Sequence, residues 1–167
     1  MALTPQPPPD RPAGWASDLV RQAFEREFDA QAGVAGNSSA EHAKLQAAEQ
    51  LASRLLAGLS QWFGGAGTLA LASRALSRAT REHPGLAAIC LSSPDPALGG
   101  LAHAAEAHGA AATVDGVLTM LTELVGAMGR LVNDELAAVI FARSAAPHPR
   151  PTDGAATTPA PPLPLDQ

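Results

Sequence analysis

The sequence predicts an all-α fold, a single bundle of four to five helices between two disordered, proline-rich termini. Apolar residues recur at the three- and four-residue spacing of helices through the middle of the chain. Strand signals are weak, because Tyr is absent and no run alternates apolar and polar residues. Five of the fifteen prolines lie in residues 1–12 and seven in residues 147–164, where they exclude regular helix.

These patterns divide the 167 residues into four parts around one domain. We expect a disordered tail at 1–14, a peripheral helix and linker at 15–36, a helical bundle at 37–143, and a disordered Pro/Ala-rich tail at 144–167. No repeat at the period of a solenoid is present in the sequence.

Charge and composition narrow the expected partners and location. A net charge of −5 disfavours general binding of nucleic acid, which needs a basic surface. The single cysteine, Cys90, fits a reducing cytoplasm and leaves no cysteine pair for a disulfide or a zinc site. The N-terminus does not resemble a signal peptide. Asp115, Glu123 and Arg130 interrupt the most apolar segment, 114–132, and argue against a membrane helix.

The first half of the chain predicts a peripheral helix followed by a helical hairpin. Val20, Phe24 and Phe28 would line one face of a helix from Trp15 to about Ala30. A second helix starts near Asn37, where Ser38 and Glu41 have the spacing of a capping box. Gly64 and Gly65 end it, and the four-residue turn Gly64–Gly67 leads into a third helix, capped by Thr68, that runs to Glu82 before His83-Pro84.

The second half predicts one or two helical turns within 86–91, a loop at 92–96, a helix at 97–108 and a long final helix at 113–143. We expect that last helix to be continuous or gently kinked, although Asp134-Glu135 after Asn133 is typical of a fresh helix start. The apolar stripe that supports continuity is Val114, Val117, Leu118, Leu121, Leu124, Val125, Met128, Leu131, Val132, Leu136, Val139 and Ile140.

Arginines offer the first candidate for an interaction surface. Arg74, Arg78 and Arg81 share one helical face and would suit an acidic partner or an anion. The alternative is an ordinary solvated face, with Arg78 paired to Glu82. Gly64–Thr68 resembles a phosphate-binding turn, but it has no preceding strand and no Lys before the Thr, which favours a tight helix–helix turn.

The sequence gives weaker support to metal-binding, thiol and catalytic sites. His103, Glu106 and His108 supply too few ligands at unsuitable spacing for a stable metal site, and no cofactor site is expected. Cys90 lies in an apolar run, which predicts a buried, inert thiol. An enzyme would need a dyad such as His83 with Glu82 or Asp95.

Two further features bear on binding. Trp62 and Phe63 are expected in the core, with one of them a possible exposed anchor. The Pro-x-x-Pro pattern of 158–164 would suit a polyproline receptor or form a plain solubilising tail.

Three short runs resemble a group of small uncharacterised helical proteins from bacteria. They are the runs Leu69–Leu76, Pro84–Leu86 and Leu131–Leu136. The resemblance covers about Leu51 to Arg143 and implies no particular activity. It makes Arg74 the charged residue most worth testing.

The function expected from these observations is a non-enzymatic protein-interaction or regulatory accessory module in the bacterial cytoplasm. Its partner would be another protein or a second copy, because the final apolar stripe exceeds what a small core covers. The alternative is a small-molecule or anion-binding bundle with a pocket near Arg74.

Overall fold

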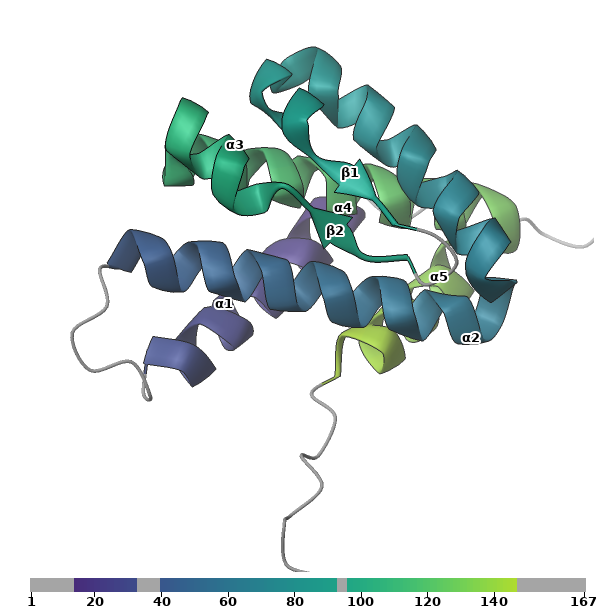
Figure 1. The fold of residues 1–167 in the computed structure, drawn as a ribbon. Helices are drawn as coiled ribbons and strands as arrows, with labels where there is room; N and C mark the ends of the chain where they lie inside the picture. Colours follow the sequence, from purple (N-terminus) through teal and green to yellow (C-terminus); the bar gives the residue numbers. More distant parts are fainter. Residues whose placement is uncertain (1–13, 33–39, 93–95, 147–167) are drawn as a thin grey trace, which may run out of the picture.

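In a computed structural model, residues 14–32, 40–92 and 96–146 are described, and they form a helical bundle with one short ribbon of strands (Figure 1). The helices are α1 (Trp15–Ala32), α2 (Ala40–Glu82), α3 (Leu101–His108), α4 (Ala110–Val132) and α5 (Asp134–Ala145). A 3-10 helix, Pro84–Ala88, and strands β1 (Cys90–Leu91) and β2 (Leu98–Gly99) connect α2 to α3. The predicted all-α bundle is confirmed, whereas most of both predicted tails, and the Ser38 cap, lie outside the described residues.

Helix α4 is the centre of the bundle, in contact with α1, α2, α3 and α5. Val117, Leu121, Leu124, Val125 and Met128 of the predicted stripe are completely buried, and so is Met120, which the stripe did not include. They pack with buried leucines of α2, namely Leu51, Leu55, Leu56 and Leu59. Each such side chain contributes about 1.5–3 kcal/mol by leaving water. The bundle is therefore stabilised mainly where α2 and α4 meet.

Helix α1 packs against both α2 and α4. Val20 is 1% exposed and belongs to the common core. Phe24 and Phe28, predicted to share a face, stack with their ring centroids 6.5 Å apart. The N-terminal helix thus covers an apolar face of the bundle.

The long helix α2 folds back on itself at Gly64, the single non-helical residue within it (φ 70°, ψ 165°). Figure 1 shows the ribbon reversing there, so that residues 40–63 and 65–82 form two arms. The predicted hairpin is confirmed, but its turn is one residue rather than four. The prediction that Thr68 caps the third helix is wrong, because Thr68 lies inside the second arm and is completely buried. As predicted, the second arm ends at Glu82, before Pro84.

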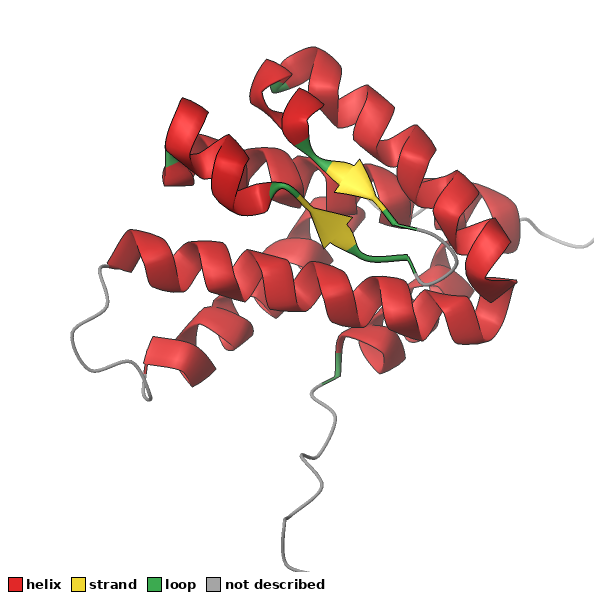
Figure 2. Cartoon of the chain, viewed as in Figure 1, coloured by secondary structure: helices red, strands yellow, loops and turns green. Residues whose placement is uncertain are grey.

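The two short strands lie between the arms of α2 (Figure 2). They are antiparallel, with Cys90 opposite Gly99 and Leu91 opposite Leu98. The helix predicted from 97 therefore starts only at Leu101. Strands of two residues are too short to show the alternation that identifies a strand in a sequence.

The continuous or gently kinked helix predicted over 113–143 is instead two helices, α4 and α5, because the chain breaks at Asn133 (φ 98°, ψ 160°). The Asn133 side chain accepts a hydrogen bond of 2.8 Å from the Leu136 amide and so caps α5. The fresh start at Asp134-Glu135 is the correct interpretation, with acidic groups at the positive end of the helix. Past the break, α5 buries Ala137, Ile140 and Phe141 and exposes Leu136 and Val139.

Substitutions of Asn133 should separate its backbone strain from its capping role. This φ/ψ region is populated almost only by glycine and costs other residues about 1–3 kcal/mol. We expect Asn133→Gly to raise the free energy of unfolding by about 1 kcal/mol, because strain is relieved and glycine is a tolerable cap. Asn133→Ala should lower it by about 1 kcal/mol, because the cap is lost and the strain stays. Urea denaturation followed by circular dichroism measures both, and equal stabilities of the two variants would contradict this account.

Helix α4 is also the one described helix with the length and apolar composition to cross a membrane. Half of its most apolar window is buried inside the bundle, as in a core helix of a folded domain.

Candidate functional site

The predicted arginine face is divided by a contact to α4. Arg78 donates a hydrogen bond of 2.9 Å from its Nη1 to Glu123, rather than pairing with Glu82 as considered above. The two side chains remain 45% and 35% exposed, so the ion pair stabilises the fold by less than about 1 kcal/mol. Arg74 and Arg81 are exposed and have no ion-pair partner within the described residues. The face therefore offers two separate cations, with Arg78 held between them.

Within the described residues, His83 and Glu82 do not form the dyad that an enzyme would need. The Nε2 of His83 lies 3.1 Å from the hydroxyl oxygen of Thr119, and no carboxylate takes that position. Asp95 lies outside the described residues. Because the partner of this ring nitrogen is a hydroxyl, the pair lacks the orienting carboxylate of a catalytic triad.

The structure also bears on the predicted thiol and metal sites. Cys90 is exposed, which contradicts the prediction of a buried thiol, because its short strand turns the side chain outward. Among the described residues, no three His, Cys, Asp or Glu side chains are close enough to hold a metal ion, and this includes His103, Glu106 and His108. The Pro-x-x-Pro segment lies outside the described residues.

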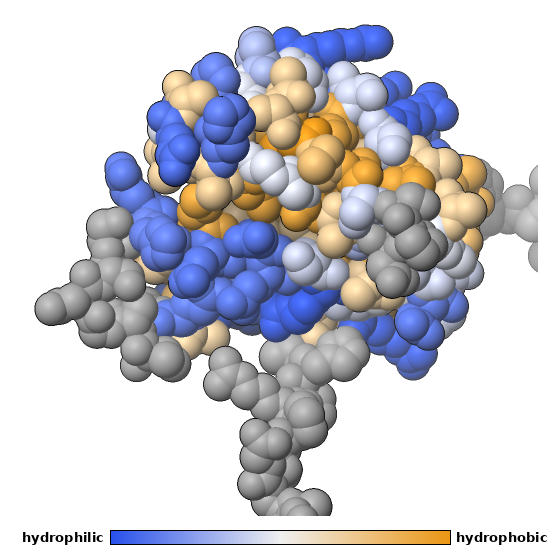
Figure 3. Space-filling view, in the orientation of Figure 1, coloured by the Kyte–Doolittle hydropathy of each residue, from blue (hydrophilic) through white to orange (hydrophobic). Residues whose placement is uncertain are grey.

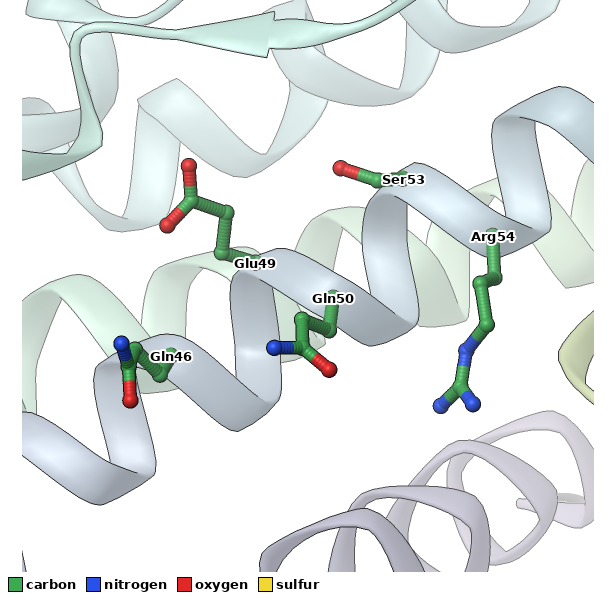
Figure 4. Close-up of a pocket in the computed structure, with 5 residues that line it drawn as sticks. All are labelled: Gln46, Glu49, Gln50, Ser53 and Arg54. Atoms are coloured by element: carbon green, nitrogen blue, oxygen red, sulfur yellow. The ribbon is translucent and has the colours of Figure 1, made fainter. Parts of the chain in front are cut away.

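A polar hollow of about 390 Å³ follows the first arm of α2 (Figure 4). All five of its labelled side chains come from that one helix, and they do not converge. Arg54 extends toward α1, whereas Glu49 and Ser53 lie on the side facing the strands. A ligand site needs polar groups that meet at one point, so this hollow is a groove of a helix surface.

Arg54 instead ties α2 to α1. It forms an ion pair with Glu27, whose other carboxylate oxygen accepts a hydrogen bond of 3.2 Å from Gln31. Burial of the Arg54 guanidinium disfavours its charged form and lowers its pKa. The pair joins residues 27 positions apart and is structural in character.

A second hollow, of about 410 Å³, lies between α1, α4 and the end of α2. Its lining includes the carboxylates of Glu82, Asp115 and Glu123 and one cation, Arg21. This balance repels an anion, so it does not support the anion-binding alternative. No sequence pattern marks this hollow, because its residues come from three separated segments.

Apolar surface is gathered in two places. In the view of Figure 3 it covers the region of the two strands, above a hydrophilic band along the first arm of α2. The exposed apolar residues there include Ala87, Ala88 and Ala97, which are too small to anchor a partner.

The second apolar surface consists of large side chains at the junction of α4 and α5. Leu131 is 63% exposed, Leu136 42% and Val139 48%. We call these three residues the α4–α5 corner. The remaining large hydrophobic with comparable exposure among the described residues is Trp62, at 48%, on α2. The predicted stripe contained all three corner residues, but Leu131 lies exposed in the last turn of α4, and the break at Asn133 leaves Leu136 and Val139 on the outward face of α5.

No model of a known protein family, no characterised protein and no solved structure matches the chain.

Proposed function

We propose that this protein is a non-enzymatic interaction module that binds a protein partner through the α4–α5 corner. One observation carries the proposal: three of the four most exposed large hydrophobic side chains within the described residues lie within the stretch 131–139. Clustered apolar side chains of this size are typical of protein-binding surfaces. A regulatory accessory role in a bacterial cytoplasm fits the acidic charge and the single cysteine.

The surroundings of the corner support a docking role over a structural one. Val139 and Leu136 lie on a helix whose opposite face is already packed by Ala137, Ile140 and Phe141. The fold therefore does not need these side chains, and water contact with them costs about 25 cal/mol for each Å² of apolar area. Arg143 and Glu135 on the same helix would supply the polar rim that surrounds a binding patch.

The double variant Leu131→Ser/Val139→Ser tests the proposal against Trp62→Ser, which removes an exposed apolar side chain elsewhere. Association of the tagged protein is measured in host lysate by quantitative mass spectrometry and in purified form by light scattering. We expect the double variant to weaken association at least about 10-fold, whether the partner is another protein or a second copy of the chain, because central apolar anchors dominate binding. Unchanged association in the double variant, or equal loss in Trp62→Ser, would contradict the proposal.

A further inference from the structure

The outward face of α5 has a symmetric arrangement of residues about Val139. Glu135 and Arg143 lie four positions before and after Val139, and Leu136 and Ala142 lie three positions before and after it. All five are exposed, whereas Ala137, Ile140, Phe141 and Ser144 are buried on the opposite side. At about 100° per residue, these five positions form one continuous face.

We propose that this face binds the same face of a second copy, with the two α5 helices antiparallel across a two-fold axis at Val139. Val139 would then contact Val139 of the other copy, and each Leu136 would lie over the smaller Ala142. Each Glu135 would lie beside Arg143 of the other copy, which makes two ion pairs. The inference rests on the proposed function and names its partner.

Charge complementarity selects this arrangement. Glu135 and Arg143 have no ion-pair partner among the described residues of their own chain, so both are available. A parallel pair would place Glu135 against Glu135 and Arg143 against Arg143, which is repulsive. A two-fold interface is also self-complementary, so that one surface serves both copies.

The size of the face sets the expected strength. Helix α5 has 12 residues and is therefore about 18 Å long. One helix face is smaller than the roughly 800 Å² per partner of a standard interface. Leu131, two residues before the break at Asn133, adds apolar area beside the start of α5. We expect a reversible dimer with a Kd on the order of 10–100 µM.

Charge reversal with mixing is the decisive experiment. Analytical ultracentrifugation of the full chain compares the wild type, Glu135→Arg, Arg143→Glu and an equimolar mixture of the two variants. Each variant alone places like charges together, so its self-association should weaken at least about 10-fold. The mixture pairs every Arg with a Glu and should return to within about 3-fold of the wild type. Circular dichroism checks that both variants keep the helical fold.

Val139→Asp adds a test at the axis, where two like charges would meet, and should abolish dimerisation while Trp62→Ser leaves it intact. A wild-type monomer at all concentrations, or a mixture no tighter than its components, overturns the antiparallel dimer. If the wild type is monomeric but Leu131→Ser/Val139→Ser loses a lysate partner, this inference fails and the proposed function stands. If no association depends on the corner, both fail.

Discussion

Replacement of Gly58 by alanine is expected to lower the free energy of unfolding by about 2 kcal/mol. Gly58 lies on α2 where α5 crosses it, and an added Cβ would lie 2.7 Å from the backbone Cα of Ser144. A backbone atom cannot turn away as a flexible side chain does, so α5 would have to move. Overpacking of this kind costs about 1–3 kcal/mol or more, which outweighs the gain of about 1 kcal/mol from higher helix propensity.

The control for Gly58 is another helical glycine with room around it. At Gly126 on α4 the nearest atom to an added Cβ is the Arg130 Nη1, 3.6 Å away, an ordinary contact. Gly126→Ala should therefore stabilise the protein by about 0.5–1 kcal/mol. Urea denaturation measures both variants, and equal effects would show that α2 and α5 are not in close contact at Gly58.

A second-site change makes the test of the α2–α5 contact more specific. Ser144→Gly removes the Cβ and Oγ atoms that an alanine at residue 58 would meet and keeps the backbone Cα, so it relieves the clash in part. In a double-mutant cycle, the pair Gly58→Ala/Ser144→Gly should show a favourable coupling of about 1 kcal/mol.

Replacement of Gly64 by alanine should also cost about 2 kcal/mol, for a different reason. No atom lies within 4 Å of an added Cβ at Gly64, so sterics with neighbours play no part. The cost comes from the backbone, because φ 70° and ψ 165° belong to a region that side chains with a Cβ rarely adopt. Such strain is worth about 1–3 kcal/mol.

The second substitution Ser144→Gly distinguishes the Gly64 prediction from the Gly58 prediction. Ser144→Gly should not restore the stability of Gly64→Ala, because the two sites share no contact in this account. Thermal unfolding of the single and double variants measures this difference. If Gly64→Ala were as stable as the wild type, the fold-back of α2 at residue 64 would not need a positive φ.

Local signals in the sequence predicted most of the helices. The proline after His83 predicted the end of the second arm of α2, and Gly64 predicted the point where α2 folds back on itself. Each of these acts within about one helical turn, through a missing amide, a fixed φ or a positive φ. The two-residue strands escaped prediction because they are stabilised by their place between the arms of α2, and no local pattern encodes that place.

Contacts over long separations could not be predicted from spacing. Arg78 pairs with Glu123, 45 residues away, although the sequence offered Glu82 four residues away. Arg54 pairs with Glu27 across two helices. Cys90 was expected to be buried by the apolar residues around it, yet the strand pairing exposes it. Side chains meet in these cases because helices cross, and crossing is a property of the packed bundle.

The sequence by itself determined an all-α bundle, the fold-back of α2 at Gly64 and the apolar stripe of α4 as far as Met128. Around Asn133 the sequence contained two opposing signals. The apolar stripe predicted that the helix continues, and Asp134-Glu135 predicted that a new helix starts. Only the tertiary structure decided between them, because the inward side of α5 is set by packing against α2 and α4 rather than by the phase of the preceding helix. That decision placed Leu136 and Val139 in water and created the surface for which we propose a second copy of the chain.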